Sequence, residues 1–222
     1  MGKDRRTTPP GPTAGDAVHT IVRAGLSAIP GIGGPATELF AALITPPLTK
    51  RRDEWMQSIA EGLKALEVKV DGFKIESVAG NAAFVTTVMQ TSQIAMRNHQ
   101  KEKLEALRNA VLNAALEPPE EGVQAVLLSF IDIATSWHLK VLNFYHNPES
   151  RLKELGIELV MGDYLSHYVS SIFPELKAQE AFRLQIERDL LHFGLVFTEG
   201  TWYERRTTDT GERVLALILS PL

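Results

Sequence analysis

The six histidines of this 222-residue chain are its first candidates for metal binding or proton transfer, because histidine titrates nearest neutral pH. Asp163 and His167 are four residues apart and could share one face of a helix. A zinc site needs at least three protein ligands, and no HExxH pattern supplies the third. His138 follows Trp137 in a strongly apolar stretch, where a buried, hydrogen-bonded histidine is the commoner arrangement. We therefore predict no metal site.

The glycine-rich stretch PGIGGP, residues 30–35, has the composition of a phosphate-binding loop. Such a loop normally follows a buried strand and leads into a helix with a Gly-Lys-Thr or Gly-Lys-Ser sequence. Here a helical pattern precedes the glycines and no such sequence follows. We interpret the stretch as a tight corner between two short helices.

No other group of residues predicts catalysis. The chain has no cysteine, which removes thiolate nucleophiles and cysteine-based metal sites, and it lacks the strand-to-helix nucleophile elbow of hydrolases. Two pairs of carboxylates fall at positions that we expect to be solvated: Glu120 with Glu121, and Glu175 with Glu180. We predict a protein that is not an enzyme and needs no cofactor and no small-molecule substrate.

The composition is that of a globular protein, with 44% hydrophobic and 23% charged residues. The formal net charge of −4 is too small to define a polyanion-binding or an acidic solvating protein by itself. The opening residues are charged where a signal peptide would be apolar, and no uncharged apolar run reaches about 18 residues. These features predict a cytoplasmic protein.

Helical periodicity dominates the chain after a Pro-, Gly- and charge-rich stretch, residues 1–14, that we expect to be a disordered tail. Short helices are expected over 16–29 and from Pro35 to a point before Pro46, because proline favours a first turn and disfavours helix in the residue before it. A longer helix is expected over 49–70, capped by Thr49. Further helices are predicted over 76–98, 100–117, 120–147 and 148–156, with one bent helix over 76–117 as the alternative to the first two.

The C-terminal third has a different pattern. A helix is predicted from Pro174 to Gly194, followed by two short strands, 195–198 and 201–207, with a turn at Gly200. A last helix opens at DTGE, where Asp209 and Glu212 have the spacing of a capping pair.

This pattern resembles the end of a winged-helix domain. The residues that carry the resemblance are ERDLLHFGLVFTEGTWYERRTTDTGERVLALI, 187–218: a recognition-type helix, a two-stranded wing and a closing helix after TxxG. The stretch EKLEALRNAVLNAAL, 102–116, with the Pro- and Gly-rich region before it, resembles bacterial proteins linked to abortive infection, of the alpha type. The fold expected is mainly α: a helical bundle, 15–117, then a winged-helix-like part, 118–222, with one small β-hairpin.

The winged-helix resemblance implies either DNA or protein as the partner. A helix that grips DNA needs a surplus of cations, but here three cations meet four acids: Lys177, Arg183 and Arg188 against Glu175, Glu180, Glu187 and Asp189. Aromatic residues and arginine are preferred anchors of protein interfaces, and the predicted wing carries four: Trp202, Tyr203, Arg205 and Arg206. We expect a protein partner, which includes a second copy of this chain, and weak DNA binding.

A membrane is the third kind of partner to consider. Residues 17–48 form two apolar runs around the Pro-Gly corner, each too short to cross a bilayer. The side chains that would touch lipid are Leu26, Ile29, Leu39, Phe40 and Leu43, and we expect them instead to pack against the helical bundle. The sequence thus predicts a non-enzymatic interaction or adaptor protein of a bacterial antiphage system. The alternatives are a membrane-active effector and a winged-helix DNA-binding regulator.

Overall fold

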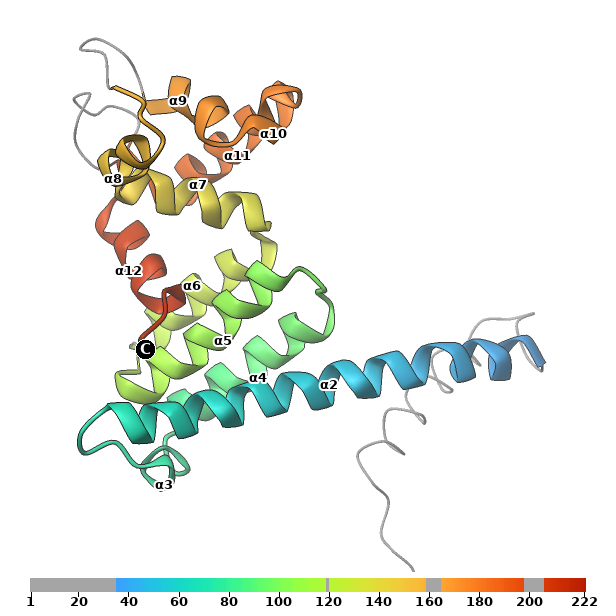
Figure 1. Ribbon diagram of the computed structural model, residues 1–222. Coiled ribbons are helices and arrows are strands. Elements are labelled where there is room, and N and C mark those ends of the chain that lie inside the picture. The colour runs from blue at the N-terminus through green and yellow to red at the C-terminus, as the bar shows by residue number, and fades with distance from the viewer. Residues whose placement is uncertain (1–34, 119, 159–164, 198–205) are drawn as a thin grey trace, which may run out of the picture. The chain divides into compact units, whose positions relative to one another are not determined.

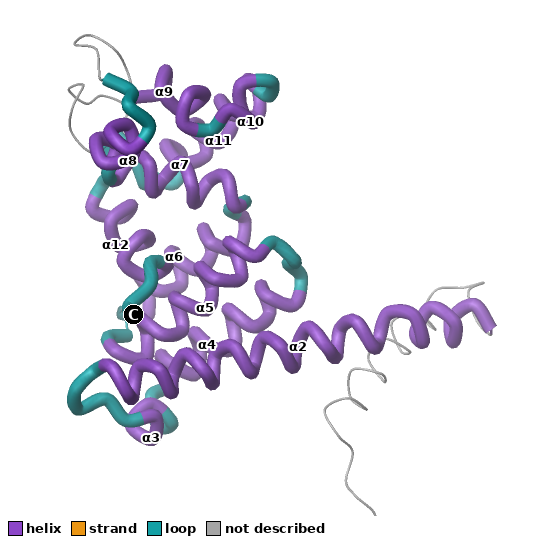
Figure 2. Tube along the Cα trace, viewed as in Figure 1, coloured by secondary structure: helices purple, strands orange, loops and turns teal. Residues whose placement is uncertain are grey.

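The computed structural model describes residues 35–118, 120–158, 165–197 and 206–222, and over these residues the chain is mainly helical. Figure 2 shows helices joined by short loops. This confirms the mainly α class. The predicted tail, the helix over 16–29 and most of the predicted hairpin lie outside the described residues.

The chain divides into two compact units, one ending at Gln57 and one beginning at Ser58. The predicted boundary at 117/118 lies within the second unit.

The first described helix, α2 (Pro35–Lys69), begins at Pro35 as predicted but continues through Pro46 and Pro47. The predictions of a helix end before Pro46 and of a cap at Thr49 are therefore wrong. Each proline removes one N–H bond, to the carbonyl of Ala42 or Leu43. The two prolines and these two residues are exposed, so water can bind the two released carbonyls.

The continuous helix also sets the direction of the apolar residues near its start. Leu39 and Leu43, one turn apart, are 62% and 63% exposed, whereas Ala41, on the opposite side, is 2% exposed. The prediction that these two leucines pack inward is wrong, because α2 turns a small alanine rather than its leucines to the buried side. Leu26 and Ile29 lie outside the described residues, and so does the side chain of Phe40.

The second unit consists of the end of α2 and ten further helices among the described residues. These are α3 (Ile75–Val78), α4 (Ala82–Met96), α5 (Lys101–Leu116), α6 (Glu121–Ile133), α7 (Ser136–His146), α8 (Pro148–Glu154), α9 (Leu165–Ile172), α10 (Pro174–Lys177), α11 (Glu180–His192) and α12 (Asp209–Ile218). In Figure 1, α4 to α6 form one layer and α7 to α11 another, and α12 contacts both α5 and α7.

The α2 segment in this unit packs closely against α5. Ile59 and Leu66 are buried, and Gly62 lies between them on the same face. A Cβ atom at Gly62 would come within 2.8 Å of a Leu112 side-chain atom and 2.9 Å of Arg108. The Arg108 Nε also donates to the Ser58 carbonyl over 3.0 Å. A side chain at this position would therefore have to displace the ends of the Leu112 and Arg108 side chains.

The apolar stretch 120–147 is two helices rather than the single central helix predicted. α6 ends at extended Ala134, and the Thr135–His138 capping box begins α7. Buried Lys103 of α5 donates from Nζ to the carbonyls of Asp132 and Ala134, both over 2.7 Å, and so binds the end of α6. No single described helix is long and apolar enough to span a membrane; α6 and α7 meet that criterion only together, bent by 120°.

Two more predicted helices are divided by local capping. The stretch 76–98 becomes α3 and α4, because the Asn81 side chain accepts from Phe84 N over 3.1 Å and starts a new helix. The helix predicted from Pro174 is divided at Gln179, the N-cap of α11. The predicted stops are confirmed: Gly156 and Gly194 follow α8 and α11 with φ of 66° and 65°.

The chain after α11 forms an antiparallel bridge between Val196 and Thr207 and then enters α12. Phe197 N donates to the Arg206 carbonyl over 2.8 Å. Thr208, not Asp209, is the N-cap of α12, and its side chain accepts from Gly211 N over 3.1 Å. The predicted capping pair was therefore displaced by one residue. Thr208 also binds the preceding segment, donating from its hydroxyl to the Gly194 carbonyl over 2.6 Å.

Gly211 of the TxxG sequence is expected to be intolerant of any side chain. A Cβ atom there would overlap the backbone carbonyl of Leu195, which cannot move as a side chain can. We expect Gly211→Ala to lower the free energy of unfolding by about 1 to 3 kcal/mol, the usual cost of overpacking, measured by urea unfolding. Gly80→Ala is the control, since nothing lies within 4 Å of its Cβ position. Equal midpoints for the two variants would contradict the close approach.

Candidate functional site

The C-terminal helix α12 is held on α5 by two asparagine side chains. Asn109 Nδ2 donates to the Ile218 carbonyl over 2.9 Å, and Asn113 Nδ2 donates to the carbonyls of Leu217 and Leu219 over 2.7 and 2.9 Å. The last carbonyls of a helix have no partner within it, so these amides act as a cap supplied by a distant helix. Asn109 is 5% exposed.

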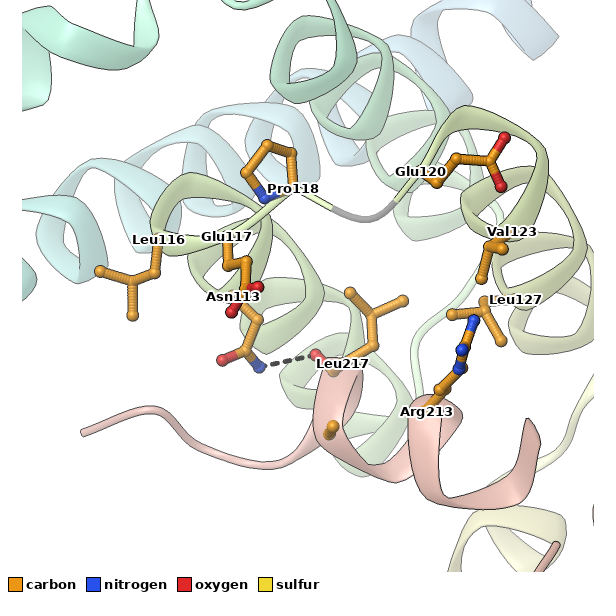
Figure 3. Close-up of a pocket in the computed structure, with 10 residues that line it drawn as sticks. Asn113, Leu116, Glu117, Pro118, Glu120, Val123, Leu127, Arg213 and Leu217 are labelled. Carbon is orange, nitrogen blue, oxygen red and sulfur yellow. Dashed lines mark hydrogen bonds between the residues drawn. The ribbon is translucent and has the colours of Figure 1, made fainter. Parts of the chain in front are cut away.

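Beside this attachment lies an open groove of about 470 Å³ between the end of α5, the start of α6 and α12 (Figure 3). Leu127 and Leu217 are buried at its base. The remaining lining residues are Asn113, Leu116, Glu117, Pro118, Glu120, Val123, Arg213 and Ala216. We call these ten residues the α12 groove. An apolar base with a polar and charged border is the arrangement found in protein interfaces.

Arg213 is the group of the α12 groove best suited to bind an anion. It makes no ion pair or hydrogen bond with any other described residue, and Figure 3 shows it rising from α12 toward Val123 and Leu127. A guanidinium can bind a carboxylate through two parallel hydrogen bonds. Glu117 is exposed at the end of α5, and Glu120 caps α6 by accepting from Gly122 N over 3.2 Å. The border therefore carries both signs of charge.

The walls of the groove suit a macromolecule better than a small ligand. Leu116 is 38% exposed, and Glu117, Glu120, Arg213 and Ala216 are also exposed. A pocket for a small molecule covers about 70 to 90% of its ligand, which walls as open as these cannot do. A helix or extended segment that covers the groove from outside would instead bury Leu116 and the base together.

A second polar cluster lies between α7, α11 and the residues beside the Val196–Thr207 bridge. Arg183 Nη1 binds Glu187 Oε1 over 2.6 Å, and both side chains are 14% exposed. The Arg206 guanidinium lies 5.0 Å from the centre of the Tyr145 ring, and its Nε donates to the Phe197 carbonyl over 2.8 Å. These contacts join α7, α11 and the bridge region.

The electrostatics of this cluster are those of a buried structural site. Burial, followed by the charge of Glu187, raises the pKa of Tyr145 well above its usual range. Burial also raises the pKa of Glu187, against the opposing effect of Arg183. The Tyr145 side chain is fully buried, and its hydroxyl makes no hydrogen bond of ordinary geometry within the described part of the chain.

Two histidines, His138 and His146, make structural contacts. His138 is 7% exposed; its Nδ1 accepts from Thr135 N over 3.1 Å. Its Nε2 lies 3.2 Å from Asp189 Oδ2. The prediction of a buried, hydrogen-bonded histidine is confirmed. His146 Nδ1 lies 3.0 Å from Glu212 Oε1, which also accepts from the Thr207 hydroxyl.

The structure describes only some of the other residues that were predicted to form sites. Trp202, Tyr203 and Arg205 lie outside the described residues, and so does Asp163, the proposed neighbour of His167. Arg206 is half-buried against Tyr145 rather than displayed on a surface. Glu120, Glu175 and Glu180 are exposed, as expected of solvated carboxylates. Within the described ranges, no group of three or more His, Asp or Glu could hold a metal ion.

Sequence reasoning missed the residues that form the α12 groove. Arg213 and Glu117 are separated by nearly a hundred residues, and neither has a distinctive neighbour. One signal was present: Asn109 and Asn113 are four residues apart on a helix that is otherwise buried along that side. Two amides on a buried face require carbonyl partners, which predicts that another chain segment ends there.

Asn109→Ala is expected to destabilise the attachment of α12. The change leaves the Ile218 carbonyl buried and unpaired, which costs about 1 to 3 kcal/mol of unfolding free energy. Urea unfolding measures the loss, and hydrogen exchange of the α12 amides should become faster than that of α4. Asn143→Ala on exposed α7 surface is the control, expected within about 0.5 kcal/mol of the unchanged chain. An equally small effect of Asn109→Ala would refute the capping role.

No protein-family model, no curated protein and no solved structure matches this chain. The geometry and chemistry of the α12 groove are therefore the basis for inferring a function.

Proposed function

We propose that this chain is a non-enzymatic protein-interaction or adaptor protein, and that the α12 groove is its binding surface. The observation that carries the proposal is an arginine, unpaired among the described residues, beside an open apolar groove. Arginine is among the residues that contribute most to binding in protein interfaces. An amphipathic helix with two or three apolar residues on one face matches the base of the groove, and an acidic residue at its edge would bind Arg213.

The ion pairs of α11 support protein binding ahead of DNA binding. Of the three cations counted on the helix predicted from Pro174, Arg183 lies on α11, where Glu187 binds it and Glu180 lies at 3.9 Å. Neutralised arginines release no counterions from a phosphate backbone and add little to DNA affinity. The assignment of the four wing residues to partner binding stays a prediction. A role in phage defence stays a hypothesis, supported only by the resemblance of residues 102–116 to abortive-infection proteins.

Selection of helical peptides displayed on phage against the full chain tests the groove. We expect enriched peptides with apolar residues at i, i+3 or i+4 and an acidic residue at the edge of that stripe. Arg213→Glu should weaken their binding at least about tenfold, because it replaces an attractive pair with a repulsive one. Titration calorimetry measures the affinity.

Arg188→Glu is the matched control for that variant. It makes the same change of charge at an exposed arginine of α11 and should leave peptide affinity within about twofold of the unchanged chain. Selection that enriches no sequence, or peptides that bind the Arg213→Glu chain equally well, would refute the groove as the binding surface.

Membrane action is the second candidate, and the exposure of Leu39 and Leu43 favours it. Two leucines one turn apart and more than 60% exposed form an apolar edge on α2 that could enter a lipid interface. If lipid covers them, Leu39→Asn with Leu43→Asn should reduce flotation with phosphatidylglycerol liposomes and leave the melting temperature unchanged. Met56→Asn, on an α2 residue 49% exposed, is the control. An unchanged chain that does not float would exclude this function.

A further inference from the structure

The C-terminal end of α5 is negative and has no basic residue in its last turn. Glu117 is the C-cap of this helix. A helix carries roughly half a negative charge at its C-terminus, so a carboxylate at this position adds to that charge instead of balancing it. Glu117 is exposed and forms no ion pair with another described residue.

Two prolines leave carbonyl groups at this end of α5 without donors from the chain that follows. The last helical bond is donated by Glu117 N. Pro118 and Pro119 come next and have no N–H. In a longer helix their positions would donate to the carbonyls of Ala114 and Ala115, and no described residue donates to these carbonyls. The end of α5 therefore combines a carboxylate with unused acceptors.

The opposite wall of the α12 groove carries the opposite charge. Figure 3 shows Arg213 on α12 and Glu117 at the end of α5, on the two sides of the groove. Neither forms an ion pair with the other or with another described residue. Asn109 and Asn113 fix α12 on α5, so the fold itself keeps the two charges apart. Glu120, the other carboxylate of the border, is already used as the cap of α6.

We propose that the α12 groove binds a partner helix with two charged edges, an acidic edge along α12 and a basic edge along the end of α5. This inference rests on the proposed function and adds the second charge that the partner must carry. A lysine or arginine of the partner meets Glu117 and the open carbonyls, and it donates hydrogen bonds to both. The apolar residues between the two edges cover the base of the groove.

Loss of water at the end of α5 is the reason that the second edge is basic. A helix that covers the groove displaces water from Glu117 and from the open carbonyls. Polar groups that lose water and gain no new donor cost free energy, and an acidic edge adds repulsion to that cost. Glu117 therefore selects against helices that are acidic on both edges, and Arg213 selects against helices that are basic on both.

The two edges correspond to fixed positions in the sequence of the partner. When apolar residues occupy positions a and d of a heptad, positions e and g lie on the two sides of the apolar stripe. The partner then has acidic residues at one of these positions and basic residues at the other. Binding through Arg213 alone requires only the acidic edge.

Three helical peptides of two heptads test the basic edge. Each is stapled on its outer face and has leucine at a and d and glutamate at e, while position g is lysine, glutamine or glutamate. Titration calorimetry with the full chain should give the tightest binding for lysine and the weakest for glutamate. We expect the lysine peptide to bind about three- to tenfold more tightly than the glutamine peptide.

Glu117→Lys should reverse this order of affinities. The new lysine repels the lysine edge and attracts the glutamate edge. The change also places a cation at a helix C-terminus, which the helix dipole favours, so the melting temperature should not fall. Glu175→Lys is the matched control: it makes the same change at an exposed glutamate of α10 and should keep the original order.

The same peptides separate failure of this inference from failure of the groove. If the unchanged chain binds all three equally and Arg213→Glu weakens all three, the groove binds helices and the basic edge is refuted. If the preference for lysine persists in the Glu117→Lys chain, the basic edge binds elsewhere and the inference is overturned. If no peptide binds the unchanged chain, both the groove and this inference are overturned.

Discussion

The attachment of α12 to α5 is the constraint on which the rest of the second unit depends. Two amides from the middle of the chain bind carbonyls at its end, across sequence separations of more than a hundred residues. The other end of α12 is fixed by Thr208 and by the approach of Gly211 to Leu195. With both ends held, the outward side of α12 has one orientation. Arg213 is therefore placed beside the apolar base of the groove without a bond of its own to the described residues.

A side chain of α5 also binds carbonyls at the end of α6. Lys103 of α5 binds the two carbonyls at the end of α6, and burial lowers its pKa while the nearby charge of Asp132 opposes that shift. A buried ammonium is costly unless its hydrogen bonds are satisfied, so these two carbonyls fix where α6 stops and α7 begins. α5 thus supplies polar side chains that terminate two other helices, while its apolar residues fill the core. Polar side chains, rather than apolar packing alone, determine the lengths of the helices around it.

The sequence correctly predicted those helix starts, helix ends and buried side chains that depend on neighbouring residues. Pro35 begins α2, Gly156 and Gly194 follow the ends of α8 and α11, and the burial of His138 follows from its apolar surroundings. The predicted helix ends were wrong where distant contacts or solvation determine how far a helix extends. Solvation of Ala42 and Leu43 lets α2 pass through two prolines, and Lys103 with the Thr135–His138 capping box divides the stretch 120–147. The α12 groove was not predictable, because no local pattern shows that Glu117, Val123 and Arg213 will meet.

The helix α6 forms one wall of the α12 groove, and side chains bind both of its ends. Glu120 caps its N-terminus, and Lys103 binds the carbonyls at its C-terminus. Val126 and Leu127 are adjacent residues, which a helix directs about 100° apart, so Leu127 lies buried at the base of the groove while Val126 is 61% exposed. The contacts at its two ends thus determine which residues of α6 line the groove opposite Arg213.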